Sequence, residues 1–339
     1  MKRILIGVFM ICCGAHAIAQ DINFSQFYEL PLLRNPALSG FYRGDIRVTS
    51  GFRRQWGSVT VPFQTMALGV ETKFNVSDRS GDYVSIGLQT TNDIAGDSRL
   101  GKTQVMPAVT YHKTLNGEDS YLSLGFIGGL VQQRFDPSRL SFDDQFVNGS
   151  YSATNPTSQT FNNTNLSYFD MSVGAAYSTS FGYESKMYIG AAYFHFNKPK
   201  VAFSREHDIS LNPKIVFNVG VNTPVSEIDQ LFFYGDFFYQ GGSYQGQGGA
   251  LLSHSFVEEE EDYKLAMGVG LFYRWNDALV PLVKFDYYNL SLGVSYDVNV
   301  SKLKTASQMK GGFELTLSYR NYLNIRSSSS RQQRCPVEF

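Results

Sequence analysis

Cysteine is scarce in this sequence. The 339 residues include three cysteines, of which Cys12 and Cys13 lie in an apolar N-terminal stretch. If that stretch is removed, Cys335 remains alone, so no disulfide within the chain can stabilise the fold. Long hydrophobic runs are also missing: after residue 19, none approaches the roughly 18 to 20 residues that a membrane-spanning helix requires. A large core or a lipid environment must therefore stabilise the fold, and a membrane location would require a closed barrel.

The sequence also lacks an excess of positive charge. Lys and Arg total 29 against 30 Asp and Glu, a formal net charge of -1. Because the basic footprint of a nucleic-acid-binding protein is absent, we predict no nucleic-acid partner. No histidine has a second His, Cys or acidic cluster at metal-ligand spacing, and no catalytic motif is found. We predict no metal, no cofactor and no enzyme activity; a hydrolase whose residues assemble from distant strands is the least favoured alternative.

The first nineteen residues, MKRILIGVFMICCGAHAIA, have the order of a secretory signal peptide. Two positive charges precede an apolar core, and the small residues Ala17 and Ala19 provide a cleavage site. We predict a signal peptide over 1–19, a mature chain that begins at Gln20, and export of the protein.

Aromatic residues and glycine are plentiful. There are 27 Phe and 21 Tyr against 2 Trp, together with 31 Gly, which favours strands, turns and membrane-surface aromatic girdles over helices. Apolar and small or polar residues alternate: in 290–299, Leu292 and Val294 alternate with Gly293 and Ser295. Such alternation is typical of a lipid-facing row opposite a polar lumen row. The same pattern occurs in 65–74, 169–178, 264–274 and 313–320.

Fourteen candidate strands follow from this alternation, most near the roughly 9 to 11 residues that cross a bilayer. They start near residues 44, 63, 82, 102, 119, 167, 186, 213, 229, 244, 263, 279, 289 and 311. The three longest connections, about 134–166, 198–210 and 300–310, follow odd-numbered strands, so all three lie outside if both ends of the barrel sequence are periplasmic. We predict an all-β fold, a transmembrane antiparallel β-barrel of the outer membrane with about 14 strands. This single domain covers 20–339, with an N-terminal periplasmic or plug segment at 20–43 and a C-terminal tail at 321–339.

Several motifs resemble one family. FSQFY at 24–28, PLLRNPALSGFYRG at 31–44 and RRQW at 53–56 resemble the start of the PorP/SprF family of type IX secretion system outer-membrane proteins from Bacteroidetes. The chain departs from the family pattern at Ser39, where Ala is usual, and at Arg34, where Leu is common. Later matching segments, in the same order as in the family, are 193–203, 272–287, 292–303, 311–319 and the final CPVEF at 335–339.

This resemblance implies a function in protein secretion. A family member would be an outer-membrane barrel that supports the secretion or surface attachment of cargo proteins with type IX C-terminal signals, including mobile adhesins in gliding bacteria. Its partners would be type IX secretion components of the periplasm and outer membrane, the cargo, and outer-membrane lipid. From the barrel pattern alone, a solute channel or small-hydrophobe transporter remains the alternative.

The aromatic segment before the first strand contains most of the candidate site residues. Pro31 and Pro36 forbid a regular helix through it, while its aromatic side chains need an apolar environment. It either fills the lumen as a plug or serves as a docking strip for a periplasmic component or cargo, and the residues alone leave both interpretations open. The candidates for plug formation or partner binding are Phe24, Ser25, Gln26, Phe27, Tyr28, Asn35, Pro36 and Trp56. The basic, Ser-rich tail at 324–339 is a second candidate for periplasmic contact.

Overall fold

The fold is known from a computed structural model that describes residues 21–323, except for 56, 58–60, 77–80, 116–119, 148, 153, 162, 183, 204–208, 257–264 and 302–309. The predicted signal peptide, Trp56 and the tail at 324–339 lie outside the described residues. None of the described helices is long and apolar enough to cross a membrane.

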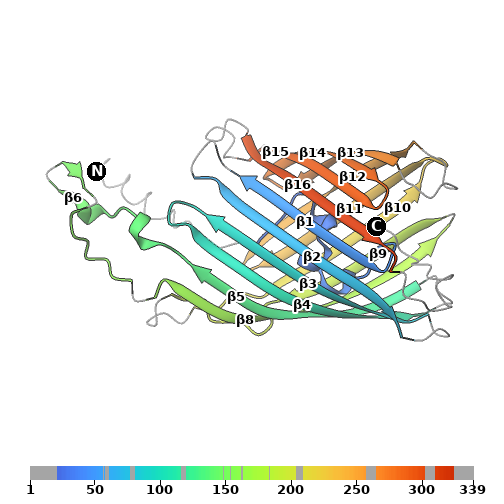
Figure 1. The fold of residues 1–339 in the computed structure, drawn as a ribbon, viewed down its shortest axis with the longest axis horizontal. Helices are drawn as coiled ribbons and strands as arrows, with labels where there is room; N and C mark the ends of the chain where they lie inside the picture. The colour runs from blue at the N-terminus through green and yellow to red at the C-terminus, as the bar shows by residue number, and fades with distance from the viewer. Residues whose placement is uncertain are drawn as a thin grey trace, which may run out of the picture.

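Fourteen antiparallel strands close into a barrel (Figure 1), which confirms the predicted fold class and strand number. Each predicted strand start lies within two residues of the observed one. Along the barrel wall, each strand pairs with the next wall strand in sequence, β5 pairs with β8, and β1 pairs with β16 to complete the closure. The strands are β1 Ile46–Gln55, β2 Phe63–Asn75, β3 Tyr83–Ala95, β4 Leu100–Thr114, β5 Ser120–Arg134, β8 Asn165–Phe181, β9 Ser185–Phe194, β10 Lys214–Pro224, β11 Asp229–Gln240, β12 Ser243–Ser255, β13 Leu265–Arg274, β14 Ala278–Tyr287, β15 Leu290–Asn299 and β16 Lys310–Asn321.

The two ends of the barrel differ. β5, β9 and β15, which precede the three long connections, all end at the same end of the barrel, which we call the loop end, as the sequence predicted. The opposite end, the turn end, has short hairpin connections and the end of β16 (Figure 1). The connection after β5 carries a small hairpin of β6, Phe146–Val147, and β7, Ser150–Tyr151, which projects from the loop end (Figure 1).

The outer face of the wall is apolar and the inner face is polar. In β15, Leu292 and Val294 are exposed on the outside, whereas Ser295 and Asp297 are buried inside. An apolar outer band of this kind fits a lipid bilayer. Exposed aromatic residues lie near both barrel ends, as expected of girdles at the two membrane surfaces. Among them are Tyr239, Tyr244, Tyr273 and Trp275 near the loop end, and Tyr287, Tyr288, Tyr319 and Tyr322 near the turn end.

The chain before β1 lies inside the barrel (Figure 1). It forms three short helical turns, η1 Phe27–Glu29, α2 Pro31–Arg34 and η2 Pro36–Leu38. Pro31 and Pro36 occupy the first positions of α2 and η2, where the missing N–H of proline costs no hydrogen bond. The core of the protein therefore lies between this segment and the inner wall.

Candidate functional site: the segment inside the barrel

We call residues 21–43 the lumen segment. A polar anchor sets its course at η2, where the Asn35 side chain accepts a hydrogen bond from the Ala37 amide at 2.9 Å and donates one to the Ala175 carbonyl of β8 at 3.2 Å. Thr110 of β4 donates to the Pro36 carbonyl at 2.7 Å. The Asn-Pro-Ala sequence thus forms a capped turn whose polar atoms bind two strands of the wall.

The Ser25 and Gln26 backbone binds the wall next to the closure of the barrel. Both amides donate to the Glu314 carboxylate of β16, at 2.7 and 2.6 Å. The Ser25 hydroxyl donates to Asp297 of β15 at 2.6 Å, and Thr316 donates to the Gln26 side-chain oxygen at 2.7 Å. All of these groups are buried, so each hydrogen bond offsets a desolvation cost.

Phe27 and Tyr28 pack against an aromatic part of the inner wall. The Tyr28 ring stacks on Tyr234 of β11, with centroids 4.7 Å apart and an interplanar angle of 5°. Phe27 meets Phe272 of β13 edge to face at 5.7 Å. The wall therefore provides the apolar environment that these aromatic side chains require.

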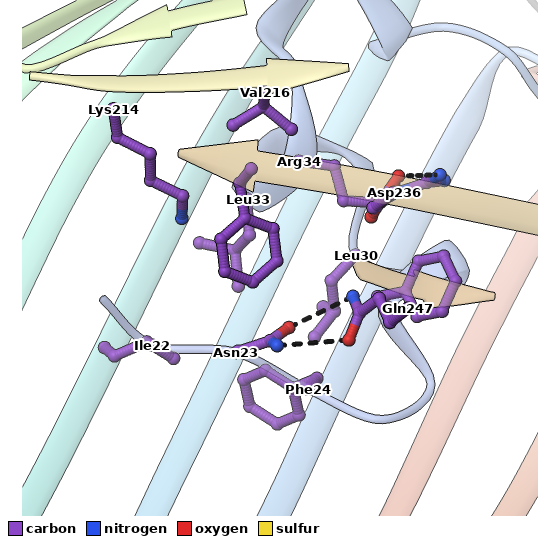
Figure 2. Close-up of a pocket in the computed structure, with 12 residues that line it drawn as sticks. Ile22, Asn23, Phe24, Leu30, Leu33, Arg34, Lys214, Val216, Asp236 and Gln247 are labelled. Carbon is purple, nitrogen blue, oxygen red and sulfur yellow. Dashed lines mark hydrogen bonds and ion pairs between the residues drawn. The ribbon is translucent and has the colours of Figure 1, made fainter. Parts of the chain in front are cut away.

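Arg34 forms a buried ion pair with Asp236 of β11. Its Nε and Nη2 atoms donate to the two carboxylate oxygens at 2.8 and 2.6 Å, and Nη1 donates to the Tyr188 hydroxyl at 2.8 Å. Figure 2 shows this pair beside the reciprocal amide pair of Asn23 and Gln247. Burial would lower the pKa of Arg34, but the carboxylate raises it above its ordinary value. Arg34 therefore stays charged and fixes α2 to β11.

Glu29 provides a second buried charge on the segment. Its carboxylate accepts a hydrogen bond from Lys284 of β14 at 2.6 Å and lies 3.6 Å from the Arg320 guanidinium. Burial would raise the pKa of Glu29, but the two cations outweigh it and lower the pKa to about 2. The segment therefore carries opposite charges at Glu29 and Arg34, each matched by a charge on the wall.

At the loop end, Asp21 enters a cluster of charged side chains. Its carboxylate accepts from His195, just beyond β9, at 2.7 Å and from Lys102 of β4 at 3.2 Å, and Lys214 of β10 lies 3.7 Å away. The other ring nitrogen of His195 lies 2.7 Å from Asp170 of β8. Burial alone would lower the pKa of His195, but the two carboxylates raise it to about 9.

The cluster predicts a pH dependence of stability. Because the pKa of His195 rises from 6.5 to about 9 on folding, its contribution, about 3 kcal/mol at most, is fully present below pH 6.5 and is lost as the pH rises through 9. We expect H195N to flatten this loss in denaturant unfolding of the reconstituted barrel between pH 6 and 9.5. His254, whose side chain is 45% exposed, provides the control H254N, which should leave the loss intact. An unchanged pH profile in H195N would contradict the assignment.

Small cavities adjoin the lumen segment. Two cavities adjoin it, of about 30 and about 50 Å³, and both border Ile22, Leu33 and Lys214. Figure 2 shows the first, between the segment and the wall. Such volumes hold a few water molecules. Within the described ranges, no group of three or more His, Cys, Asp or Glu residues could hold a metal ion.

Seven of the eight candidate residues from the sequence lie in the lumen segment, and all seven are buried; the eighth, Trp56, is outside the described residues. The predicted site residues did not include Asp21, Glu29 and Arg34, whose charges pair with charges on the wall. Acidic residues at lumen-facing strand positions, such as Asp236 and Glu314, were the available signal, because a buried carboxylate needs a partner.

The connection at 135–164, which we call the arm, is a second ordered feature. Phe135 packs edge to face on Phe161 at 5.4 Å and on Phe203, in the connection after β9, at 5.0 Å. Gln145 and Asn155 exchange two hydrogen bonds with each other's backbone, at 3.1 and 2.9 Å. Beyond this base, the β6–β7 hairpin exposes three large apolar side chains: Phe146, Val147 and Tyr151.

A closed antiparallel barrel with an apolar outer band and a polar interior defines the class of outer-membrane barrel proteins. The family model described as "Type IX secretion system membrane protein PorP/SprF" matches residues 17–319. The chain belongs to this family, as its motifs suggested, and is thus a type IX secretion system barrel.

Comparison with curated proteins finds no match. Among solved structures, the chain is similar to the toluene transporter TodX of Pseudomonas putida, with 8% identity, coverage of 85% of this chain and 92% of that chain, and a TM-score of 0.49. A FadL homologue of Pseudomonas aeruginosa has 10% identity, coverage of 84% and 92%, and a TM-score of 0.46. BamA from Haemophilus ducreyi has 10% identity, coverage of 82% and 70%, and a TM-score of 0.41.

Proposed function

We propose that this barrel supports the secretion or surface attachment of specific cargo proteins by binding proteins and does not transport solutes. Its family membership supports a role in type IX secretion. The observation that favours binding over transport is the filled lumen: residues 24–42 are almost all buried inside the barrel, and two cavities that adjoin them measure about 30 and about 50 Å³. Cargo with a type IX C-terminal signal, such as a gliding adhesin, would therefore use an outer surface of the barrel.

The loop end is the proposed outward-facing end. Outer-membrane barrels keep short turns in the periplasm and long loops outside, and the connections after β5, β9 and β15 follow that rule. The turn end, with the end of β16, would then face the periplasmic components of the secretion system.

The arm is the proposed contact surface for cargo. Phe135 packs on Phe161 and Phe203 at the base of the arm, while Phe146, Val147 and Tyr151 in the hairpin are 46 to 59% exposed. Asp143 and Asp144 adjoin them, and this acidic character disfavours contact with an anionic lipid surface and favours a protein partner. An extended cargo strand could pair with a free edge of the hairpin.

The test compares surface and secreted proteins of wild type with those of a strain lacking the gene, by mass spectrometry. We expect one or a few proteins with type IX C-terminal signals to disappear from outside. Complementation with F146S/V147S/Y151S should restore the barrel to the membrane, but the amount of those proteins outside the cell should stay at least about fivefold below the wild-type amount. V225S/I228S, which removes exposed apolar residues at the turn end, is the matched control and should restore them.

Two results would contradict the proposal. If the deletion strain secretes and displays the same proteins as wild type, the proposed role in secretion is wrong. Steady solute conductance of the purified barrel in planar bilayers would favour a channel, because the proposal requires the buried segment before β1 to fill the lumen.

A further inference from the structure

The lumen segment contacts the barrel at its closure. We call the pairing of β1 with β16 the seam; in its register, Arg53 of β1 lies opposite Glu314 of β16. Both side chains are buried, with Arg53 Nε 3.7 Å from a Glu314 oxygen. The Arg53 guanidinium also binds Asp297 of β15 at 2.7 Å and donates to the Asn23 carbonyl of the segment. One cation thus joins both sides of the seam to the segment.

The Glu314 carboxylate depends on the lumen segment for its hydrogen bonds. Among the described residues, its donors are the amides of Ser25 and Gln26, at 2.7 and 2.6 Å. The segment both covers this carboxylate and supplies its hydrogen-bond donors, so the segment stabilises β16 in its observed register.

Contacts of the Gln26 side chain fix the register of the last two strands. Its amide donates to the Ser295 hydroxyl of β15 at 3.2 Å, and its oxygen accepts from Thr316 of β16 at 2.7 Å. A Cβ atom at Gly293 of β15 would lie 2.0 Å from that oxygen. A shift of either strand by one residue would turn these side chains away from the lumen.

The path of the segment restricts the order of assembly. It enters the lumen beside the seam, where Gly44 has φ +103° and a Cβ atom would lie 2.6 Å from the Asn321 carbonyl oxygen. From there it extends through the interior to Asp21 at the loop end, 2.7 Å from His195. Side chains of the wall contact it from the seam to the loop end, so enclosing a segment that already lies on the open sheet forms these contacts without threading the chain through a closed barrel.

We propose that the lumen segment is an internal template for barrel closure. It occupies the open sheet before β16 meets β1, and the Ser25 and Gln26 amides then bind Glu314 and bring the last strand into register. The segment stays in place afterwards as the core of the barrel. This proposal concerns assembly and does not depend on the proposed function.

We call the packing of the lumen segment against the wall seating, and the pairing of β1 with β16 closure. The order of these two steps can be measured during refolding of the mature chain into detergent micelles. The Ser39 and Ser85 hydroxyl oxygens lie 2.6 Å apart and are buried, so thiols introduced by S39C and S85C, in a C335S background, report seating through protection from a maleimide pulse. Closure is followed by the compact band on unheated SDS gels. We expect protection to develop before or together with the compact band.

A substitution at the seam separates the two steps. E314Q retains shape but loses one acceptor and the charge, so closure should slow about tenfold while thiol protection keeps its wild-type rate. E71Q is the matched control, because Glu71 is equally buried and its carboxylate binds Arg47 of the adjacent strand rather than the segment. It should lower stability without separating seating from closure.

Two outcomes would overturn the template: a compact band that forms while both thiols still react, or an E314Q barrel that closes at the wild-type rate. If the cysteine variants do not fold, protection of the Arg34 peptide bond from a trypsin pulse reports seating in the otherwise unchanged chain, since Arg34 is 5% exposed. In that assay, cleavage at Arg34 in a compact barrel would equally overturn the proposal.

Discussion

Arg34→Ala is expected to reduce the free energy of unfolding by about 3 to 5 kcal/mol, because it leaves a buried carboxylate without its counter-ion. Asp236, whose side chain is 3% exposed, accepts hydrogen bonds from the Nε and Nη2 atoms of Arg34. After the substitution, Asn218, at 2.8 Å, would be its remaining hydrogen-bond donor among the described residues. The loss would also remove the cation from above the Phe27 ring, 4.8 Å from its centroid.

Urea unfolding of the barrel in lipid vesicles measures this effect. R43A is the control, since Arg43 is exposed at the turn end and its removal should change stability by no more than about 0.5 kcal/mol. R34A/D236A should recover much of the loss, because a matched pair of buried charges can be removed at little cost. If the double variant is no more stable than R34A, the unpaired carboxylate is not the cause of the loss.

The strands were predictable because the bilayer imposes a simple rule on them. Lipid outside and a packed polar lumen inside require opposite chemistry at successive residues, as in β13, where Met267 and Val269 are exposed and Ala266 and Gly268 are buried. The alternation depends on neighbouring residues alone. Strand starts, strand number and the placement of the long connections at one end therefore followed from local pattern.

The partners of the lumen segment were not predictable in the same way. Arg34 and Asp236 are separated by 202 positions, and Gln26 and Thr316 by 290. Pairing them requires the register of every strand between, and an error of one residue reverses the side that a side chain faces. Leu is common at the position of Arg34 in the family pattern that the motif resembles, so the motif gave no reason to expect an ion pair.

The location of the aromatic segment also required the structure. Pro31 and Pro36 excluded a regular helix, and the structure has one α-helical turn of four residues, which begins at Pro31. Local sequence could not decide between the lumen and a periplasmic surface, because Phe27 and Tyr28 would suit either. The decisive features lie on the wall, where Tyr234 of β11 and Phe272 of β13 form an aromatic surface. Both residues are far from the segment in the sequence.

The glycines of the wall were also predictable only in part, because local pattern shows which face they lie on but not what they contact. Alternation predicted small residues on the inner face, but not that the wall is shaped to the segment at particular glycines. Gly125 of β5 and Gly174 of β8 face each other in the register. A Cβ atom at Gly125 would lie 2.5 Å from the Ala37 amide nitrogen, and one at Gly174 would lie 1.9 Å from the Asn35 side-chain oxygen. Together they form a slot for the η2 turn.

Filling that slot should displace the segment. G125A places a methyl group against backbone atoms that cannot rotate away, so we expect a loss of about 2 to 3 kcal/mol, and more for G125A/G174A. The displaced segment would expose Arg34, which is 5% exposed in the folded barrel. Limited trypsin digestion of the vesicle-bound barrel should then cut at Arg34 in the double variant and not in wild type.

G101A is the matched control and should act in the opposite direction. Gly101 also lies in a wall strand, β4, but the nearest atom to an added Cβ would be Arg134 Cγ at 3.6 Å, an ordinary contact. Because alanine loses less backbone freedom than glycine on folding, G101A should be neutral or stabilise by about 0.5 to 1 kcal/mol. Equal effects of G101A and G125A would mean that the slot does not hold the segment. If G125A loses stability, G101A does not, and the double variant is cut at Arg34, then the barrel depends for its stability on the segment that fills its lumen.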